Sequence, residues 1–281
     1  MKTNFFVIFS VSLLISLSVN SKQIIPAEPS INAKSWILVD ASTGTVILEN
    51  NADLRLPPAS LAKMMTTYIT SNEIKAGRMK PEDLVTISDN AWRKGGAKTG
   101  GSTMFLDPRS KVPVIDLMKG VIIQSGNDAS VALAECLAGT EDDFAKLMNV
   151  YAKRLGMINT NFLNSSGWPE DDHYSTVYDL ALLSNALIRE FPDLYLYFSD
   201  KEFTYNDIKQ PNRNKLLSSV QGADGLKTGF TKASGWGIAA TAKRDNRRIT
   251  TVINGTNSSR SRLNEASNLI NWAFSQTSQK L

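Results

Sequence analysis

The sequence predicts an α/β (α+β) fold, in which an antiparallel sheet is flanked by helices and an all-helical lobe is inserted between the strands. Strand-like segments joined by short turns occur near both ends of the chain, at residues 36–49 and 235–253. Helical periodicity dominates the stretch between them, from 114 to 191. Because one sheet would draw strands from both ends, we expect roughly residues 75–195 to form the inserted lobe, with the functional site between the two parts.

The elements follow in order along the chain. Residues 36–40 and 45–49 surround the turn signal Ser42-Thr43-Gly44, which predicts a hairpin. The proline pair Pro57-Pro58 precedes an apolar run and predicts a helix that begins at Ser60. Apolar spacing predicts further helices at 141–155, 176–189 and 262–274, and β patterns predict strands at 202–205, 235–242 and 248–253.

The N-terminal segment is typical of a secretory signal. It has a positive start at Lys2, an apolar stretch over 5–19 that is short for a membrane span, and small residues near Ser21. We expect a signal peptide over 1–21, a catalytic domain over 22–281, and a protein exported to the periplasm or another extracytoplasmic part of the cell envelope. An uncleaved N-terminal anchor is the alternative.

Ser60 and Lys63 form the only Ser-x-x-Lys pattern in the chain. On a helix, side chains three residues apart share a face, so the hydroxyl and the amine can meet. A serine hydroxyl needs a base to become nucleophilic, and a lysine can serve if burial or nearby positive charge makes its neutral form accessible. The pair therefore predicts a nucleophile and its base; a helix-capping serine beside a solvated lysine is the alternative.

A second serine motif, Ser125-Gly126-Asn127, follows an apolar stretch and precedes another helical run, so we expect it in a rigid loop between two buried helices. The alternative for the same role is Ser88-Asp89-Asn90, whose residues match the known catalytic motif Ser-Asp-Asn. Because Ser88 stands between a strand pattern and a helix pattern, we interpret it as a helix cap. Ser125 and Asn127 are the predicted site residues.

Lys-Thr-Gly also occurs twice, at Lys98 and at Lys227. Lys98 stands in a glycine-dense loop with no strand pattern, whereas Lys227, Thr228 and Gly229 open the long β pattern near the C-terminus. A lysine on an edge strand beside the nucleophile can hold a substrate carboxylate, and the strand's N–H groups can bind a developing oxyanion. Lys227 is therefore the predicted anion-binding residue.

With these motifs placed, the chain resembles the low-molecular-mass penicillin-binding proteins, the serine D-alanyl-D-alanine carboxypeptidases, with a serine β-lactamase/DD-peptidase-like fold. The resemblance runs from Ala33 to the C-terminus and includes further segments: Trp36-Ile37-Leu38-Val39-Asp40, Tyr174-Ser175-Thr176, Asn212-Arg213-Asn214, Asp224-Gly225-Leu226 and Arg262.

The resemblance implies a role for each matching residue. Ser60 would be the acylated nucleophile, Lys63 the general base, and Ser125 with Asn127 the proton relay and amide-binding groups. Lys227, Thr228 and Arg262 would anchor the terminal carboxylate of the peptide. The backbone N–H groups of Ser60 and Phe230 would form the oxyanion hole, and Gly229 and Phe230 would also be substrate-binding residues.

The activity implied is removal of the terminal D-alanine from peptidoglycan stem pentapeptides, with β-lactam antibiotics as covalent inhibitors. A serine β-lactamase is the enzymatic alternative, although the segment around Glu170 lacks the Glu-x-x-Leu-Asn pattern that activates water in class A members. A non-catalytic wall-binding relative is the other alternative. Since the chain stops at Leu281, we expect no C-terminal β-rich domain and no clear membrane anchor after signal cleavage.

Composition predicts neither a nucleic-acid partner nor a cofactor or metal. The net charge is +4 and the basic residues are scattered, which does not make a nucleic-acid-binding stripe. The only histidine, His173, stands in a polar loop and is expected to be a surface or capping residue, with a Ser-His-Asp triad as the alternative. The lone cysteine, Cys136, is expected to be a small buried hydrophobe.

Overall fold

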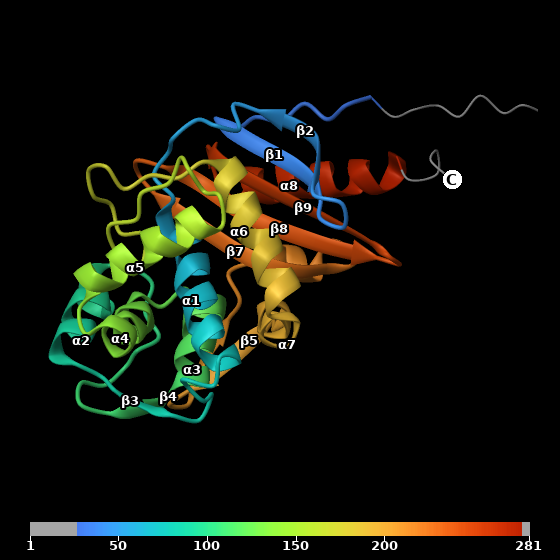
Figure 1. The fold of residues 1–281 in the computed structure, drawn as a ribbon. Coiled ribbons are helices and arrows are strands. Elements are labelled where there is room, and N and C mark those ends of the chain that lie inside the picture. The colour runs from blue at the N-terminus through green and yellow to red at the C-terminus, as the bar shows by residue number, and fades with distance from the viewer. Residues whose placement is uncertain (1–26, 277–281) are drawn as a thin grey trace, which may run out of the picture.

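In the computed structural model, which describes residues 27–276, a five-stranded antiparallel sheet forms the centre of the protein (Figure 1). Its order is β2-β1-β9-β8-β7, so both ends of the chain contribute strands to it, as the sequence predicts. The predicted signal peptide lies outside the described residues. The strands are β1 (Ser35–Asp40), β2 (Thr45–Asn50), β7 (Ala223–Thr231), β8 (Gly235–Arg244) and β9 (Arg247–Thr256).

Short turns fix the register of these strands. In the first hairpin the N–H of Gly44 donates to the carbonyl oxygen of Asp40 at 2.8 Å, and Gly44 has a φ of 77°, which favours glycine. The last three strands form a continuous antiparallel meander. Because β7 pairs only with β8, its other edge remains open for a neighbour.

Helices cover both faces of the sheet. On one face, Ala266, Leu269 and Ile270 of α8 (Ser259–Ser275) pack with Ile238 and Ile253 of the sheet. The other face carries α6 (Val177–Glu190), which contacts β1 and β9, and α1 (Lys63–Lys75) beyond it. Figure 1 shows α6 in front of the sheet and α8 behind it. The predicted α/β arrangement is therefore confirmed, with α6 lying against the sheet.

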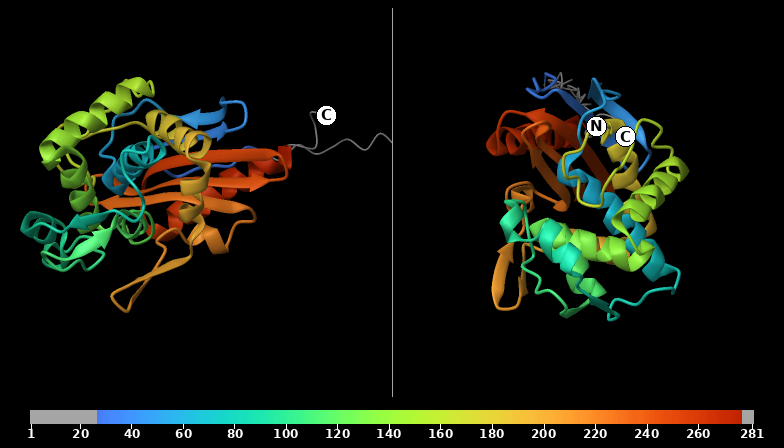
Figure 2. Two further views of the ribbon diagram at one scale, coloured as in Figure 1. Left: turned by 60° about the horizontal axis from the view of Figure 1, so that its bottom comes forward. Right: turned by 90° about the vertical axis from the view of Figure 1, so that its left-hand side faces the viewer.

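A mainly helical part lies to one side of the sheet and has its own apolar cluster, which includes Ile87, Leu117, Val121 and Leu133. It contains α2 (Asp89–Gly95), α3 (Val114–Lys119), α4 (Asn127–Ala138), α5 (Glu141–Arg154) and the short pair β3 (Leu84–Thr86) and β4 (Lys111–Pro113). Figure 2 shows this part beside the sheet and the hairpin of β5 (Glu202–Tyr205) and β6 (Ile208–Pro211) projecting from the body.

The remaining elements are single turns: the 3-10 segments η1 (Ala59–Ala62), η2 (Ala97–Thr99), η4 (Leu196–Ser199) and η5 (Lys215–Ser218), the π-helical turn η3 (Gly120–Gln124), and α7 (Pro192–Tyr195). Two of them, η1 and η3, directly precede predicted site residues. The helical segment predicted to begin at Ser60 begins one residue earlier, at Ala59, and its first turn is 3-10, so the α-helix itself starts at Lys63.

Candidate active site

The first wall of the site is the turn that carries Ser60. Ala59, the residue before it, has a φ of 49°, an unusual left-handed conformation for a side chain with a Cβ. This bend leads into η1, so Ser60 and Lys63 lie one turn apart, and the Nζ of Lys63 is 3.1 Å from the Oγ of Ser60. The structure thus brings together Ser60 and Lys63, as the Ser-x-x-Lys pattern predicts.

Lys63 is fully buried, with 0% of its surface exposed. Its Nζ also donates to the Oδ1 of Asn127 at 2.7 Å and to the carbonyl oxygen of Ser166 at 2.7 Å. Burial lowers the pKa of Lys63 to about 7, against the opposing effect of the nearby Asp128 and Glu141. Burial, more than positive neighbours, therefore makes the neutral amine accessible near neutral pH.

The second wall is the segment between α3 and α4. The π-turn η3 ends at Ser125, whose φ of 67° reverses the chain, and α4 begins two residues later at Asn127. Ser125 is 4% exposed, and its Oγ has no hydrogen-bond partner among the described residues. A buried hydroxyl without a partner costs free energy unless a ligand satisfies it, so Ser125 is available to a substrate.

The rival motifs lie elsewhere. Ser88 caps α2: its Oγ accepts a hydrogen bond from the N–H of Ala91 at 2.9 Å and donates to Glu135. Lys98 is exposed, with its Nζ 5.9 Å from the ring centre of Trp92. Both serve local structure, and the interpretation of Ser88 as a cap is confirmed.

The third wall is β7. Lys227 is 2% exposed, and its Nζ donates to the carbonyl oxygen of Thr228 at 3.1 Å. Burial lowers the pKa of Lys227 well below its usual value, and the positive charges of Lys63, Arg262 and Arg213 lower it further. No ion pair joins Lys227 to any carboxylate in the part of the chain that the structure describes. Such an uncompensated group of cations favours a bound anion.

Gly229 allows β7 to approach Ser60 closely. A Cβ at this position would lie 3.3 Å from the backbone nitrogen of Leu61 and from the Cβ of Ala59. The same reasoning applies more strongly to Gly167, where a Cβ would lie 1.7 Å from the carbonyl oxygen of Ala59. Glycine is therefore required at Gly167, and at Gly229 it avoids a tight contact with the turn of Ser60.

Arg262 reaches the site from α8. Its Nη1 donates to the carbonyl oxygens of Gly229 at 3.0 Å and Gly237 at 3.3 Å, and its guanidinium carbon lies 5.0 Å from the ring centre of Trp236. Burial lowers the pKa of Arg262 to about 10. Arg262 is thus tied to the two strands that border the site, a connection that the sequence did not reveal.

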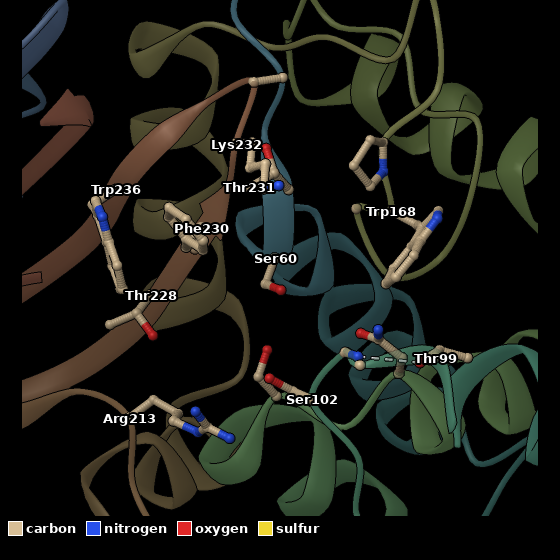
Figure 3. Close-up of a pocket in the computed structure, with 18 of the residues that line it drawn as sticks. Ser60, Thr99, Ser102, Trp168, Arg213, Thr228, Phe230, Thr231, Lys232 and Trp236 are labelled. Carbon is tan, nitrogen blue, oxygen red and sulfur yellow. Dashed lines mark hydrogen bonds between the residues drawn. The ribbon is translucent and has the colours of Figure 1, made fainter. Parts of the chain in front are cut away.

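These walls enclose a cleft of about 810 Å³ (Figure 3). It is lined by Ser60, Ser125, Asn127, Thr228, Gly229, Phe230 and Arg262 from the predicted set. Lys63 and Lys227 lie buried behind this lining. The cleft is also lined by residues that the sequence motifs did not predict as site residues: Thr99, Gly100, Gly101, Ser102, Gly167, Trp168, Pro169, Arg213, Thr231, Lys232, Ala233 and Trp236.

A loop over 164–169 supplies the last contact to Lys63. The side-chain oxygen of Asn164 accepts hydrogen bonds from the N–H groups of Ser166, Gly167 and Trp168 at 3.2, 2.8 and 3.0 Å. This arrangement points the carbonyl of Ser166 at the lysine. The residues Asn-Ser-Ser-Gly at 164–167 are typical of such a turn, but the sequence does not show that the turn lies beside Lys63.

Two expectations for single residues were wrong. His173 is buried, at 3% exposed, because its ring packs edge-on against Phe162 with 6.0 Å between ring centres. Burial lowers its pKa to about 4, and it does not line the cleft. Cys136 is exposed on α4, and partial burial of the thiol raises its pKa, so it is not activated.

Within residues 27–276, no group of three or more His, Cys, Asp or Glu side chains is arranged to hold a metal ion. None of the helices described there is long and apolar enough to cross a membrane.

A hydroxyl beside a buried lysine, a free serine hydroxyl and a cationic strand form the arrangement that a serine acyl-transfer enzyme requires. Residues 22–258 match the family model described as D-alanyl-D-alanine carboxypeptidase, peptidase S11. The chain therefore belongs to the peptidase S11 family, and the resemblance noted in the sequence is confirmed.

Among curated relatives, the chain is 47% identical to the D-alanyl-D-alanine carboxypeptidase DacC of Escherichia coli (strain K12), over 88% of this chain and 62% of that protein. It thus spans less than two thirds of that relative. Among solved structures, penicillin-binding protein 5 of Haemophilus influenzae matches with a TM-score of 0.85 and 39% identity, covering 89% of this chain and 73% of the other. Penicillin-binding protein D2 of Listeria monocytogenes, solved in an ampicillin-bound form, matches with a TM-score of 0.76 and 29% identity, covering 88% and 100%.

Proposed function

We propose that the protein is a serine-type D-Ala-D-Ala carboxypeptidase that removes the terminal D-alanine from peptidoglycan stem pentapeptides through an acyl-enzyme on Ser60. One observation carries the proposal: the fully buried Nζ of Lys63, with its pKa lowered to about 7, lies 3.1 Å from the Oγ of Ser60. A neutral amine at that distance can take the hydroxyl proton as the oxygen attacks.

In the acylation step, the Oγ of Ser60 attacks the carbonyl carbon of the penultimate D-alanine. The oxyanion that forms would be bound by the backbone N–H groups of Ser60 and Phe230. The proton taken by Lys63 would pass through Ser125 to the nitrogen of the departing D-alanine, while Asn127 holds the lysine in place at 2.7 Å. The C–N bond breaks, and an ester on Ser60 remains.

The terminal carboxylate would bind the cations at β7. Lys227, Thr228 and Arg262 are the residues assigned to it, and Arg213, whose charge also lowers the pKa of Lys227, adds a further positive charge to the lining of the cleft. Gly229 keeps this anchor close to the nucleophile. Binding a free carboxylate there aligns the scissile carbonyl with Ser60.

Water then completes the cycle by attacking the ester, which releases the shortened peptide and returns the proton to Ser60. A β-lactam would follow the same first step, but its leaving nitrogen stays attached to the acyl group. None of the described lining residues is a carboxylate that could activate water strongly, and Glu170 accepts a hydrogen bond from Asn164 at 2.7 Å. We therefore expect slow release of β-lactams, and a carboxypeptidase in preference to a β-lactamase.

The substrate sets the location of the enzyme. Peptidoglycan stem peptides lie outside the cytoplasm, so the proposed function includes export to the periplasm or extracytoplasmic envelope, consistent with the signal-like residues 1–21.

The test replaces the nucleophile. Ser60→Ala should keep its circular dichroism spectrum and melting temperature, but lose D-alanine release on the order of 10⁴-fold or more and lose covalent labelling by a fluorescent penicillin. Ser102→Ala, a second cleft hydroxyl, is the matched control and should still be labelled. Full labelling of Ser60→Ala would remove Ser60 from the mechanism and, with it, this proposal.

A further inference from the structure

We propose that Glu141 is a positioning residue for the base of the reaction. It holds Ser165 in place, and with it the neighbouring carbonyl of Ser166 that accepts a hydrogen bond from Lys63, and it supplies a negative charge close to the buried amine. Glu141 does not line the cleft, so it acts through Lys63 and not on the substrate. The inference rests on the proposed function, because it assigns how the amine of Lys63 is held ready to take the proton of Ser60.

Glu141 is buried at the start of α5, with 8% of its surface exposed. Its Oε1 accepts two hydrogen bonds from Ser165, from the Oγ at 2.7 Å and from the N–H at 3.2 Å. Its Oε2 lies 3.5 Å from the Nζ of Lys94, whose side chain is 57% exposed. A buried carboxylate is costly unless it is hydrogen-bonded, and an exposed lysine at that distance is a weak partner. The bonds to Ser165 are therefore the main contacts of Glu141.

Ser165 is held from three helices. While Glu141 of α5 accepts from its N–H and its hydroxyl, its carbonyl oxygen accepts from the Oγ1 of Thr66 on α1 at 2.7 Å and from the Oγ of Ser130 on α4 at 2.8 Å. These three helices pack against one another (Figure 1). Ser165 is fully buried, so its position is set by these bonds and by the packing of the helices.

The next residue along the chain contacts the base. The carbonyl oxygen of Ser166 accepts a hydrogen bond from the Nζ of Lys63 at 2.7 Å. Peptide units are planar, so a shift or rotation of Ser165 would be carried into the direction of this carbonyl. Glu141 therefore acts on Lys63 through two consecutive residues of the chain, Ser165 and Ser166.

Few charged groups act on Lys63. Asp128 on α4 and Glu141 on α5 raise its pKa against the larger effect of burial, and Lys227 on β7 is a nearby cation, since the charge of Lys63 lowers the pKa of Lys227. A negative charge at Glu141 thus stabilises the protonated amine while it carries the proton from Ser60 to the leaving group. The charged residues of α6, which also packs against α1, bond elsewhere: Asp179 to Thr160, Glu190 to Tyr68 and Arg189 to Glu190.

Asp128 has a second task that Glu141 does not share. Its carboxylate accepts hydrogen bonds from the Oγ1 of Thr103 and from the N–H groups of Met104 and Leu106, which ties the segment 103–106 to α4. A change at Asp128 would release that segment together with the charge. A change at Glu141 leaves these bonds in place, so its effect on Lys63 can be measured separately.

The experiment measures the second-order rate of labelling by a fluorescent penicillin between pH 5 and 9 in the wild type, Glu141→Gln and Glu141→Ala. Glutamine keeps an oxygen that can accept both bonds from Ser165 but removes the charge, so the pH below which labelling falls should move down. The rate at pH 6 relative to that at pH 8 should rise about two- to threefold. Asp142→Asn makes the same change of charge in the same turn of α5 on an exposed side chain, and this matched control should keep the wild-type profile.

Alanine removes the acceptor as well as the charge. Labelling of Glu141→Ala at pH 8 should fall on the order of tenfold, because the carbonyl of Ser166 no longer holds the amine in line with Ser60. Amide hydrogen exchange of the segment 164–168 gives a second reading that does not depend on the chemistry. Exchange there should be faster than wild type in Glu141→Ala and unchanged in Glu141→Gln.

A wild-type pH profile in Glu141→Gln overturns this inference and leaves the proposed function intact, and so does wild-type labelling at pH 8 in Glu141→Ala. Loss of stability in both variants with unchanged labelling also overturns it, because Glu141 would then serve the fold alone. Absence of labelling in the wild type overturns the proposed function instead, and the exchange rates then decide whether Glu141 holds the segment that carries Ser166.

Discussion

Lys63 combines full burial with three hydrogen-bond partners, the Oγ of Ser60, the Oδ1 of Asn127 and the carbonyl oxygen of Ser166. Lysine is almost never fully buried without such partners, because the charged amine loses its hydration. The protonated amine can donate to all three partners, whereas the neutral amine keeps two N–H donors and its lone pair can accept a hydrogen bond from the hydroxyl of Ser60. The site therefore tolerates the gain and loss of a proton without a change in packing.

Acylation should depend on pH through this residue. Since burial lowers the pKa of Lys63 to about 7, the neutral form that we propose as the base is lost as the pH falls below 7. The second-order rate of labelling by a fluorescent penicillin should fall about tenfold per pH unit below that value and level off above it. A profile that is flat between pH 5 and 8 would contradict the role of Lys63 as base.

The lowered pKa of Lys63 should also make the free energy of unfolding depend on pH. The pKa of Lys63 is lower in the folded protein than the ordinary value of 10.5, so the unfolded chain binds more protons between about pH 7 and 10.5. The free energy of unfolding contributed by this group should therefore rise with pH across that window.

Helices and strands whose own sequence shows turn residues or a regular hydrophobic period could be predicted. How these elements pack against one another could not. The first hairpin, α5, α6 and the β8–β9 meander follow from turn residues and periodicity within each segment. The carbonyl of Ser166 meets Lys63, and Arg213 meets the cleft, only because segments about a hundred or more residues apart pack together. His173 was misjudged for the same reason: its polar neighbours in the sequence do not show that its ring packs on Phe162.

The two Ser-x-Asn motifs lie in different local structures. Ser125 follows the π-turn η3, whereas Ser88 caps the N-terminus of α2. Ser125→Ala should slow acylation on the order of 10²-fold, the usual cost of losing a proton-transfer partner. Ser88→Ala should leave acylation close to wild type and lower the free energy of unfolding by about 1 kcal/mol, as for loss of a helix cap. Labelling kinetics and urea unfolding of both variants distinguish the two roles. Reversed results would relocate the site to Ser88.

At the scale of the whole molecule, the site lies where three separately packed regions meet. Leu61 and Met64, which flank Ser60 and Lys63 in the sequence, belong to the apolar cluster between the sheet and the helices on one face. The segment of Ser125 borders the cluster of the helical part, which includes Ala129, and Arg262 belongs to α8 on the other face of the sheet. Since each region brings one group of site residues, the geometry of the cleft depends on how the regions pack together.

Arg262 joins two of these regions and tests that dependence. Arg262→Ala would leave the carbonyl oxygens of Gly229 and Gly237 without their buried donor and would uncover Trp236, which should lower the free energy of unfolding by about 2–4 kcal/mol. It should also reduce kcat/KM for a free-acid D-Ala-D-Ala peptide more than for a neutral ester, because the anchor for the carboxylate is weakened. Arg262→Lys is the matched control: it keeps the charge, so the ratio of the two substrates should stay near wild type even though the paired hydrogen bonds are lost. An equal loss on both substrates in Arg262→Ala, together with the expected destabilisation, would make Arg262 a brace between α8 and the sheet and leave Lys227 and Thr228 as the carboxylate anchor.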